Sequence, residues 1–544
     1  MTRVGPTAGT RNEPPTYLVI GHRDGCAEAL RRLRMHLDGH FTLRPEEDSY
    51  RERRFYDSFD RRLFRAGLLL SWTDGTWRVI ETETGAELAR RRGPAGVRLA
   101  SCRGDSVECA LDSVAREGEI GRIVAEHLDN RRLVLVLHEE EGVRRHTLVD
   151  GNGKTHGAVD LIDWRASPRI RRTGRRTRPP APTVGVIFRP LRGYRDTFDL
   201  IQEAIDGTGH TLSWSRLLQQ RFAAADLAPG YHQTKPDVEG DSREATAVSV
   251  SRIGCHLIRI MQEQVPGVLL RIDPEYLHDY RVALRRLRSV VGNLPGVFPV
   301  DVETAIRSRL RQLWMRTGAA RDLDVLEESR VAYSEEASAS LRSGVDDLAG
   351  FIRSRRIEAY TVLSAYVCAG THDADLRTLM RAFEGLAHDH GARGGKPVRH
   401  EAGAALRRRI KKVRRLSRRI DVTDESALHA LRVQCKKLRY LLEVFGGLFD
   451  VSQLGDLTRE LKWVQDALGR MNDYAVQQAT LGQFLDEMPN PTPRTAAAVG
   501  AIITGLEQSS RREQRRIRKK LPRHLRPLND RRWSELFQGA EEVL

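Results

Sequence analysis

Apolar residues follow two different spacings along the chain. Between residues 16 and 227, short apolar runs such as 133–137 and 184–188 predict strands separated by a few helices. Downstream of residue 246 the apolar positions recur every three or four residues, which predicts helices throughout. The polar, proline-containing stretch 228–245 predicts a linker, and residues 1–15 predict a disordered lead. We therefore expect an α+β chain whose second domain, 246–540, is all α.

The helical part carries the same basic helix twice. A segment that begins at His278 returns at His429, 151 residues later, and Gly318 with Asp322 recurs as Gly469 with Asp473 at the same offset. Two motifs that share one offset indicate a duplicated unit. The glycine-rich stretch 387–402 interrupts the helical pattern midway. We therefore predict two repeats, at about 246–386 and 403–540.

Each copy of this helix predicts a row of cations opposite its apolar face. At 100° per residue, one arc of the first copy holds His278, Arg281, Arg285 and Arg288, and the same arc of the second holds His429, Arg432, Lys436 and Arg439. The apolar arc packs into a bundle, so the basic arc should face a cleft or solvent. At about 1.5 Å per residue each row extends roughly 15 Å, which suits an extended anion.

The basic residues of both rows indicate an anion-binding surface. A charged helix face is usually a solvated face held by acidic residues one turn away, and this alternative stays open for single residues. Acidic partners are nearly absent from both arcs, however, so their like charges would repel. Basic runs on neighbouring helices extend the field. We predict binding by His278, Arg281, Arg285, Arg286, Arg288, Arg353, His429, Arg432, Lys436, Lys437, Arg439, Arg408, Lys412, Arg512 and Arg516. The histidines should gain charge as pH falls near about 6.5.

Composition points to a polyanionic partner and several domains. The 544 residues carry a formal net charge of +17 and a pI of about 9.9, which is typical of proteins that bind nucleic acid, polyphosphate or anionic surfaces. The six cysteines lack the paired spacing of a zinc site, and no apolar run is long enough to span a membrane. We expect a cytoplasmic protein without a bound metal or cofactor.

The helical part resembles the CHAD domain (conserved histidine α-helical domain). The resemblance rests on the His-led helices 278–288 and 428–440 and on the stretches 318–325 and 465–473. It implies two similar four-helix bundles related by approximate twofold symmetry, with a basic surface between them. It also implies binding of inorganic polyphosphate without catalysis, and possible recruitment to polyphosphate granules.

The N-terminal part resembles a CYTH domain through residues 55–68. Active members of that family form an antiparallel β tunnel that hydrolyses triphosphates with a bound divalent metal. Their first strand carries Glu-x-Glu-x-Lys, whereas residues 17–22 read Tyr-Leu-Val-Ile-Gly-His, and Arg189 ends the late strand. Metal-assisted phosphoryl chemistry needs clustered oxygen ligands. Glu81 and Glu83 should alternate onto one strand face, but this spacing is common on exposed sheets. We expect a degenerate domain without enzymatic activity.

Two other functions remain open from the sequence. A metal-dependent triphosphatase would use the CYTH-like domain, and a nucleic-acid-binding protein would use the basic helices. Nucleic acid is the less expected partner, because the basic rows show little aromatic interleaving for base stacking. Oligomeric state and protein partners are not predicted.

Overall fold

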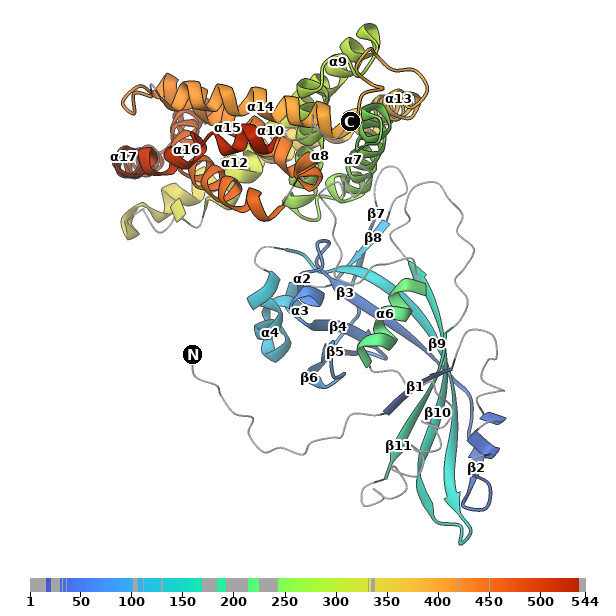
Figure 1. The fold of residues 1–544 in the computed structure, drawn as a ribbon. Helices are drawn as coiled ribbons and strands as arrows, with labels where there is room; N and C mark the ends of the chain where they lie inside the picture. Colours follow the sequence, from blue (N-terminus) through green and yellow to red (C-terminus); the bar gives the residue numbers. More distant parts are fainter. Residues whose placement is uncertain are drawn as a thin grey trace. The chain divides into compact units, whose positions relative to one another are not determined.

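The computed structural model divides into two compact units, residues 1–232 and 233–544 (Figure 1). It describes residues 16–20, 30–31, 33–35, 37–100, 106–110, 112–128, 131–168, 183–191, 214–224, 243–330, 332–333, 338–418, 420–449 and 451–537. The expected disordered lead, most of the expected linker, and the side chains of the first strand lie outside the described residues.

The first unit is an antiparallel sheet curled into a half-barrel (Figure 1). Its main path runs in the order β1-β11-β10-β9-β3-β4-β5-β6, and in the described part of the chain this path does not close. The strands are β1 (Thr16–Ile20), β2 (Phe41–Pro45), β3 (Ser49–Asp57), β4 (Leu68–Thr73), β5 (Thr76–Glu81), β6 (Glu87–Arg92), β7 (Val97–Ala100), β8 (Ser106–Cys109), β9 (Val134–Asp150), β10 (Thr155–Pro168) and β11 (Thr183–Pro190). The helices are α2 (Arg62–Arg65), α3 (Asp112–Arg116), α4 (Gly118–Leu128) and α6 (Trp214–Ala224). The predicted antiparallel sheet with helices is confirmed.

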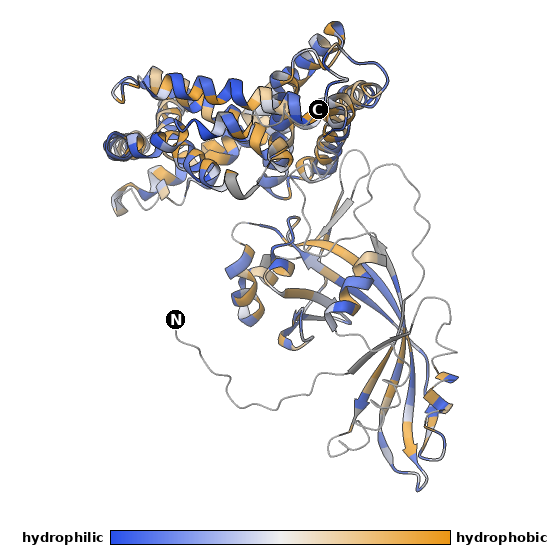
Figure 2. Ribbon diagram, viewed as in Figure 1, coloured by the Kyte–Doolittle hydropathy of each residue, from blue (hydrophilic) through white to orange (hydrophobic). Residues whose placement is uncertain are grey.

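Helices cover the sheet where apolar side chains gather. Figure 2 shows apolar residues concentrated where β3 and β9 pass α6. There Phe55 and Leu137 pack against Leu217 and Phe222 of α6. A separate cluster joins the sheet to α4. Burial of these side chains, each worth about 1.5–3 kcal/mol, holds the helices to the sheet.

The segment that resembles the CYTH family has a structural role at Asp57. Its carboxylate accepts backbone N–H groups from Leu63 at 2.9 Å and Phe64 at 3.0 Å, and so fixes the single turn of α2. Burial raises the pKa of Asp57, and these backbone bonds oppose the shift. The expected pairing of Glu81 with Glu83 on one strand face is wrong, because β5 ends at Glu81 and Glu83 lies in the following turn.

Two buried carboxylates on β9 are neutralised by arginines. Glu139 and Glu141 are almost fully buried on the face that α6 covers. Arg221 of α6 forms a bidentate pair with Glu139 and approaches Glu141 at 3.5 Å. Arg53 lies 3.1 Å from Glu141, and Trp164 Nε1 donates to the same carboxylate at 2.9 Å. This network fastens α6 to the sheet through charge.

We expect Arg221→Met to destabilise the first unit by about 3–5 kcal/mol, because it strands a buried carboxylate without its counterion. Chemical denaturation followed by tryptophan fluorescence measures the change. Adding Glu139→Gln should recover part of the loss. The exposed Arg216→Met on the same helix is the control. An Arg221→Met protein as stable as the parent would contradict this account.

The second unit is all α in the residues that the structure describes. Its helices are α7 (Thr246–Leu269), α8 (Pro274–Asn293), α9 (Val300–Arg316), α10 (Gly318–Glu328), α12 (Arg342–Cys368), α13 (Thr371–Gly385), α14 (Val398–Ser417), α15 (Glu425–Phe445), α16 (Val451–Glu487), α17 (Pro493–Leu528) and α18 (Arg532–Leu536), with short 3-10 turns at Ala339–Leu341 and Gly446–Leu448. Among these helices, none is both long and apolar enough to cross a membrane.

The duplication extends to the helix boundaries. α15, α16 and α17 begin 151 residues after α8, α9 and α12, and α14 begins 152 residues after α7. The copies differ in continuity. α16 is unbroken where the first copy breaks between α9 and α10, and α17 is unbroken where Gly370, at φ +77°, separates α12 from α13.

The two repeats contact each other through equivalent positions. Ala245 and Pro397, which precede α7 and α14, form a β-bridge. Thr246 N donates to Lys396 O at 2.8 Å, and Val398 N donates to Glu244 O at 2.9 Å. Reciprocal bonds between equivalent residues are the mark of a twofold relationship.

The distal helix pairs of the repeats also share one core. Buried residues of α10 and α12 pack with those of α16 and α17 in a single cluster. Tyr333 and Phe484, 151 residues apart, both belong to it, as do Leu348 and Val499. The repeats are therefore joined by a common core, in addition to each having its own packing.

Candidate anion-binding site

α8 and α15 place the predicted basic rows, and both begin with an aspartate cap. Asp273 accepts the N–H of Glu275 at 2.9 Å, and Asp424, its equivalent, accepts the N–H of Ser426 at 2.9 Å. An Asp cap fixes the first turn of a helix and is worth about 1 kcal/mol. Leu284, Leu287, Leu431 and Leu438 are fully buried beneath the basic rows.

The two rows meet where α8 packs against α15. Arg285 and Lys436 are equivalent residues of the two helices. The charge of the Arg285 guanidinium lowers the pKa of the Lys436 amine. Arg285 Cζ lies 4.9 Å from the centre of the Tyr440 ring, and Arg439 Cζ lies 5.6 Å from it. We call the joined rows the basic stripe: Arg281, Arg285, Arg288, Arg432, Lys436 and Arg439.

Two arginines of the first row lie against the ring of Trp314 on α9. Arg281 Cζ lies 3.9 Å from the ring centre, and Arg288 Cζ lies 5.0 Å from it. Arg281 Nη1 also donates to Trp314 O at 3.1 Å and to Thr317 Oγ1 at 2.9 Å. These contacts hold Arg281 in position without neutralising its charge.

The cations of the stripe are held at an electrostatic cost. Burial lowers the pKa of Lys436 to about 8, and the charges of Arg432 and Arg285 lower it further. Burial also lowers the pKa of Arg281 to about 10, with Arg285 adding to the effect although Asp322 opposes it. The Nε atoms of Arg285 and Arg432 are buried without a hydrogen-bond acceptor. A bound anion would supply both the missing charge and the missing acceptors.

The two histidines differ in environment. Burial, followed by the charge of Arg321, lowers the pKa of His278 to about 4. The expectation that this histidine gains charge near pH 6.5 is therefore wrong, because it is neutral down to far lower pH. His429, its equivalent, is exposed at the start of α15.

A potential metal-ligand group surrounds His278. Ligand atoms of Glu275, His278 and Asp279 lie within 4.8 Å of one another. Arg321 Nη2 lies 3.8 Å from Glu275 Oε1, so a cation already neutralises part of this group. Arg285 also acts on His278 through its charge. We propose no metal site there.

Acidic partners are more frequent near the stripe than the sequence indicated. Arg286 is buried, and its Nε lies 3.3 Å from Glu443 of α15, so it bridges the two helices. Glu443 also pairs with Arg439 at 3.0 Å. Arg432 lies 3.8 Å from Asp473 and 3.3 Å from Asn472 Oδ1.

A second basic group lies along α14. Arg408 and Arg409 both donate to Asn293 at the end of α8, at 3.1 Å and 2.7 Å. Burial lowers the pKa of Lys437, and the charges of Arg409 and Lys412 add to this. The structure thus brings Lys412 and Lys437 close to Arg409, and Arg408 lies beside Arg409 at the end of α8.

The remaining predicted residues lie on α12 and α17. Arg353 is exposed on α12, and Arg512 is exposed on α17, where it donates to Ser509 Oγ at 3.0 Å. Arg516 pairs with Glu513 at 3.1 Å and lies over the Trp463 ring at 5.5 Å. These residues extend the positive field of α12 and α17 and lie on different helices from the stripe.

Three residues of the site were not among the predicted binding residues. Trp314 and Tyr440 carry the arginines of the stripe, and Arg409 links α14 to α8. Tyr440 directly follows the second basic row, so the sequence contained a local signal for it. Trp314 lies on another helix, and only tertiary packing connects it to the stripe.

Part of the second unit matches a known protein family. Residues 252–482 match the family described as CHAD domain. The chain contains a CHAD domain. A crystal structure of the CHAD domain from the plant Ricinus communis is 22% identical over 52% of this chain and 96% of its own, with a TM-score of 0.43. PptA from Streptomyces chartreusis is 14% identical over 51% of this chain and 99% of its own, with a TM-score of 0.37. No curated protein matches.

The predicted CHAD resemblance is confirmed for residues 252–482. The second unit continues beyond them with α17 and α18. The curled antiparallel sheet of the first unit is consistent with a CYTH-like region.

Lys436→Met should stabilise the CHAD domain at pH 7 by roughly 1–2 kcal/mol, after allowance for solvent screening. The pKa of Lys436 is about 8 in the folded state, below its ordinary 10.5. Between these values the unfolded chain binds the proton more tightly, so the penalty is full below pH 8 and disappears as pH approaches about 10.5. Urea unfolding of the variant and of the parent, at pH 7 and at about pH 10.5, measures the difference in their free energies of unfolding. The exposed Lys462→Met is the control. An equal advantage at both pH values would contradict the charge argument.

Proposed function

We propose that this protein binds inorganic polyphosphate along the basic stripe, without catalysis. The observation that carries the proposal is the packing of half-buried cations from α8 and α15 together. Arg285 Cζ lies 4.9 Å from the Tyr440 ring centre on α15, and the charge of Arg285 acts on Lys436. Such a pair is unfavourable in the free protein, and a polyanion would relieve it while counterions are released. A linear chain of phosphates suits a stripe of this length. The resemblance to the CHAD domain also implies binding of polyphosphate.

Nucleic acid is the weaker candidate. Recognition of single strands without sequence preference combines cations with aromatic rings on which bases stack. The rings that contact the stripe, Trp314 and Tyr440, are each already packed against two arginines. Phosphate groups alone explain the chemistry of the stripe better than bases do.

Binding of polyphosphate would place the protein on polyphosphate granules in the cytoplasm.

The CYTH-like unit is proposed to be non-catalytic. Three of its buried carboxylates are engaged by arginines: Glu139 and Glu141 by Arg221, and Asp160 by Arg145 at 2.6 Å and Arg189 at 2.9 Å. Carboxylates that hold Mg²⁺ or Mn²⁺ need oxygens open to the ion and to water. Ion pairs within the sheet serve its stability instead.

Replacing Arg281, Arg285, Arg432 and Lys436 together with alanine should weaken binding of long-chain polyphosphate by at least tenfold. The dependence of log affinity on log salt concentration should also become shallower, because fewer anionic charges are neutralised. Isothermal titration calorimetry at several salt concentrations measures both quantities.

A matched control removes the same charge elsewhere in the CHAD domain. Arg377, Arg381, Arg494 and Lys462 are exposed and lie outside the stripe. Their combined replacement with alanine should change affinity far less than the stripe variant does. Equal losses in the two variants would mean that net charge, and not the stripe, determines binding.

We expect no metal-dependent hydrolysis of tripolyphosphate, ATP or thiamine triphosphate above background. The reason is that the buried carboxylates Glu139, Glu141 and Asp160 are paired with arginines, which leaves them few oxygens for a metal. Phosphate release is measured with Mg²⁺ and with Mn²⁺. Turnover that disappears in Glu139→Gln or Glu141→Gln would show that the unit is an enzyme.

A further inference from the structure

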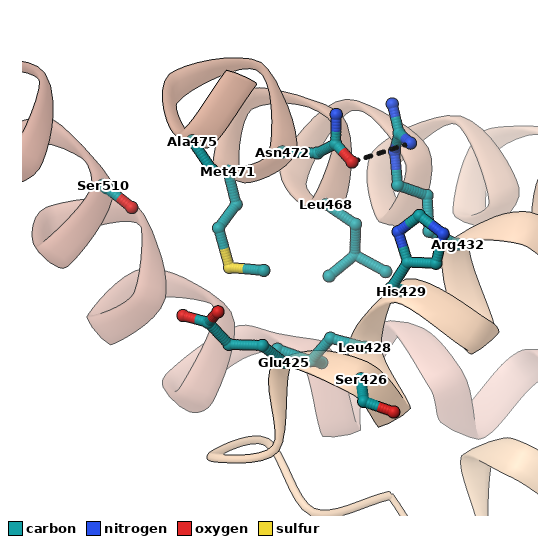
Figure 3. Close-up of a pocket in the computed structure, with 10 residues that line it drawn as sticks. All are labelled: Glu425, Ser426, Leu428, His429, Arg432, Leu468, Met471, Asn472, Ala475 and Ser510. Carbon is teal, nitrogen blue, oxygen red and sulfur yellow. Dashed lines mark hydrogen bonds between the residues drawn. The ribbon is translucent and has the colours of Figure 1, made fainter. Parts of the chain in front are cut away.

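A pocket of about 300 Å³ opens beside the second histidine (Figure 3). It lies between α15, α16 and α17, at the end of the basic stripe that Arg432 occupies. The lining residues are Glu425, Ser426, Leu428, His429, Arg432, Leu468, Met471, Asn472, Ala475 and Ser510. Its volume is at the lower end of the range for small-molecule sites, about 300–1,000 Å³.

The wall of the pocket combines apolar surface with a few polar groups. Leu468 and Met471 extend into it in Figure 3, and the carboxylate of Glu425 faces Met471. Gln514 Nε2 donates a hydrogen bond to Glu425 Oε1 of that carboxylate at 3.2 Å. On the opposite side Arg432 has a buried Nε without an acceptor. The pocket thus presents an acceptor at one end, a cation at the other, and apolar surface between them.

The first repeat lacks the features that open this pocket. Arg321 and Asp324 stand at the positions equivalent to Asn472 and Ala475. Asp324 is fully buried and accepts from Arg356 at 2.6 Å and Tyr360 at 2.8 Å. Arg321 pairs with Glu328 at 3.3 Å. A network of charged side chains therefore occupies the equivalent region, and the open pocket is a departure of the second repeat from the shared plan.

We propose that this pocket binds the base of a nucleoside polyphosphate whose phosphates lie on Arg432 and Lys436. A bare phosphate would be repelled by Glu425, whereas a base with an amino group donates to a carboxylate. The thioether of Met471 and the neighbouring leucine suit a flat ring. The inference rests on the proposed function for its phosphate half, since both ligands use the same stripe.

The test compares ligands that carry the same number of phosphates. Binding of GTP, ATP, CTP, UTP and inorganic tripolyphosphate to the full chain is measured by calorimetry at fixed salt, with long-chain polyphosphate alongside. Nucleotides whose bases carry an amino group should bind about tenfold tighter than tripolyphosphate, or about 1.4 kcal/mol. UTP, whose base lacks that group, should bind more weakly than the other nucleotides.

Two variants and a control separate the pocket from the stripe. Ala475→Phe should fill the pocket and reduce nucleotide affinity to that of tripolyphosphate, whose own affinity stays unchanged. Glu425→Gln should narrow the gap between GTP and UTP. Ala479→Phe, at an exposed position one turn along α16, should leave all affinities as in the parent.

Nucleotides that bind no tighter than tripolyphosphate would overturn the pocket and leave the stripe intact. An Ala475→Phe protein that retains the nucleotide advantage would overturn it as well. If the parent protein bound none of the phosphate ligands, long-chain polyphosphate included, the proposed function and this inference would both be overturned.

Discussion

A twofold axis brings each residue near it next to its own copy, and this constraint governs the charge of the molecule. When a basic helix is duplicated and the copies pack across such an axis, like charges must approach each other. Arg285 and Lys436 are that pair here. The shared core of the distal helices and the reciprocal backbone bonds before α7 and α14 hold the repeats together against this repulsion. The folded state therefore contains a concentrated positive charge that Glu443 and Asp473 neutralise only in part.

The same constraint ties stability to binding. Desolvated cations destabilise the free CHAD domain, and the aspartate caps, leucine core and aromatic supports of α8 and α15 offset that cost. A ligand that neutralises the cations returns part of the cost as affinity. Stabilising changes at these positions should consequently weaken binding, which is the usual conflict between stability and a charged functional site.

The parts of the structure that were predicted from the sequence are those set by local periodicity. Helical spacing and the repeated offset indicated the all-α half, and the arc of cations on each helix followed from 100° per residue. Contacts between distant residues were not accessible in this way. The pairing of Arg221 with Glu139 spans 82 residues, and that of Arg286 with Glu443 spans 157. The neutral state of His278 depends on burial and on Arg321, neither of which the helix itself specifies.

The shared core between the repeats has a consequence for how such a chain can change over evolution. A chain with one repeat would expose that apolar surface unless it formed a homodimer, and in a homodimer every substitution occurs in both halves. Covalent fusion removes this restriction. Each half can then acquire its own residues, as Asp324 and Ala475 illustrate at equivalent positions. The linked pair thereby keeps the symmetry that concentrates charge while one half becomes free to specialise.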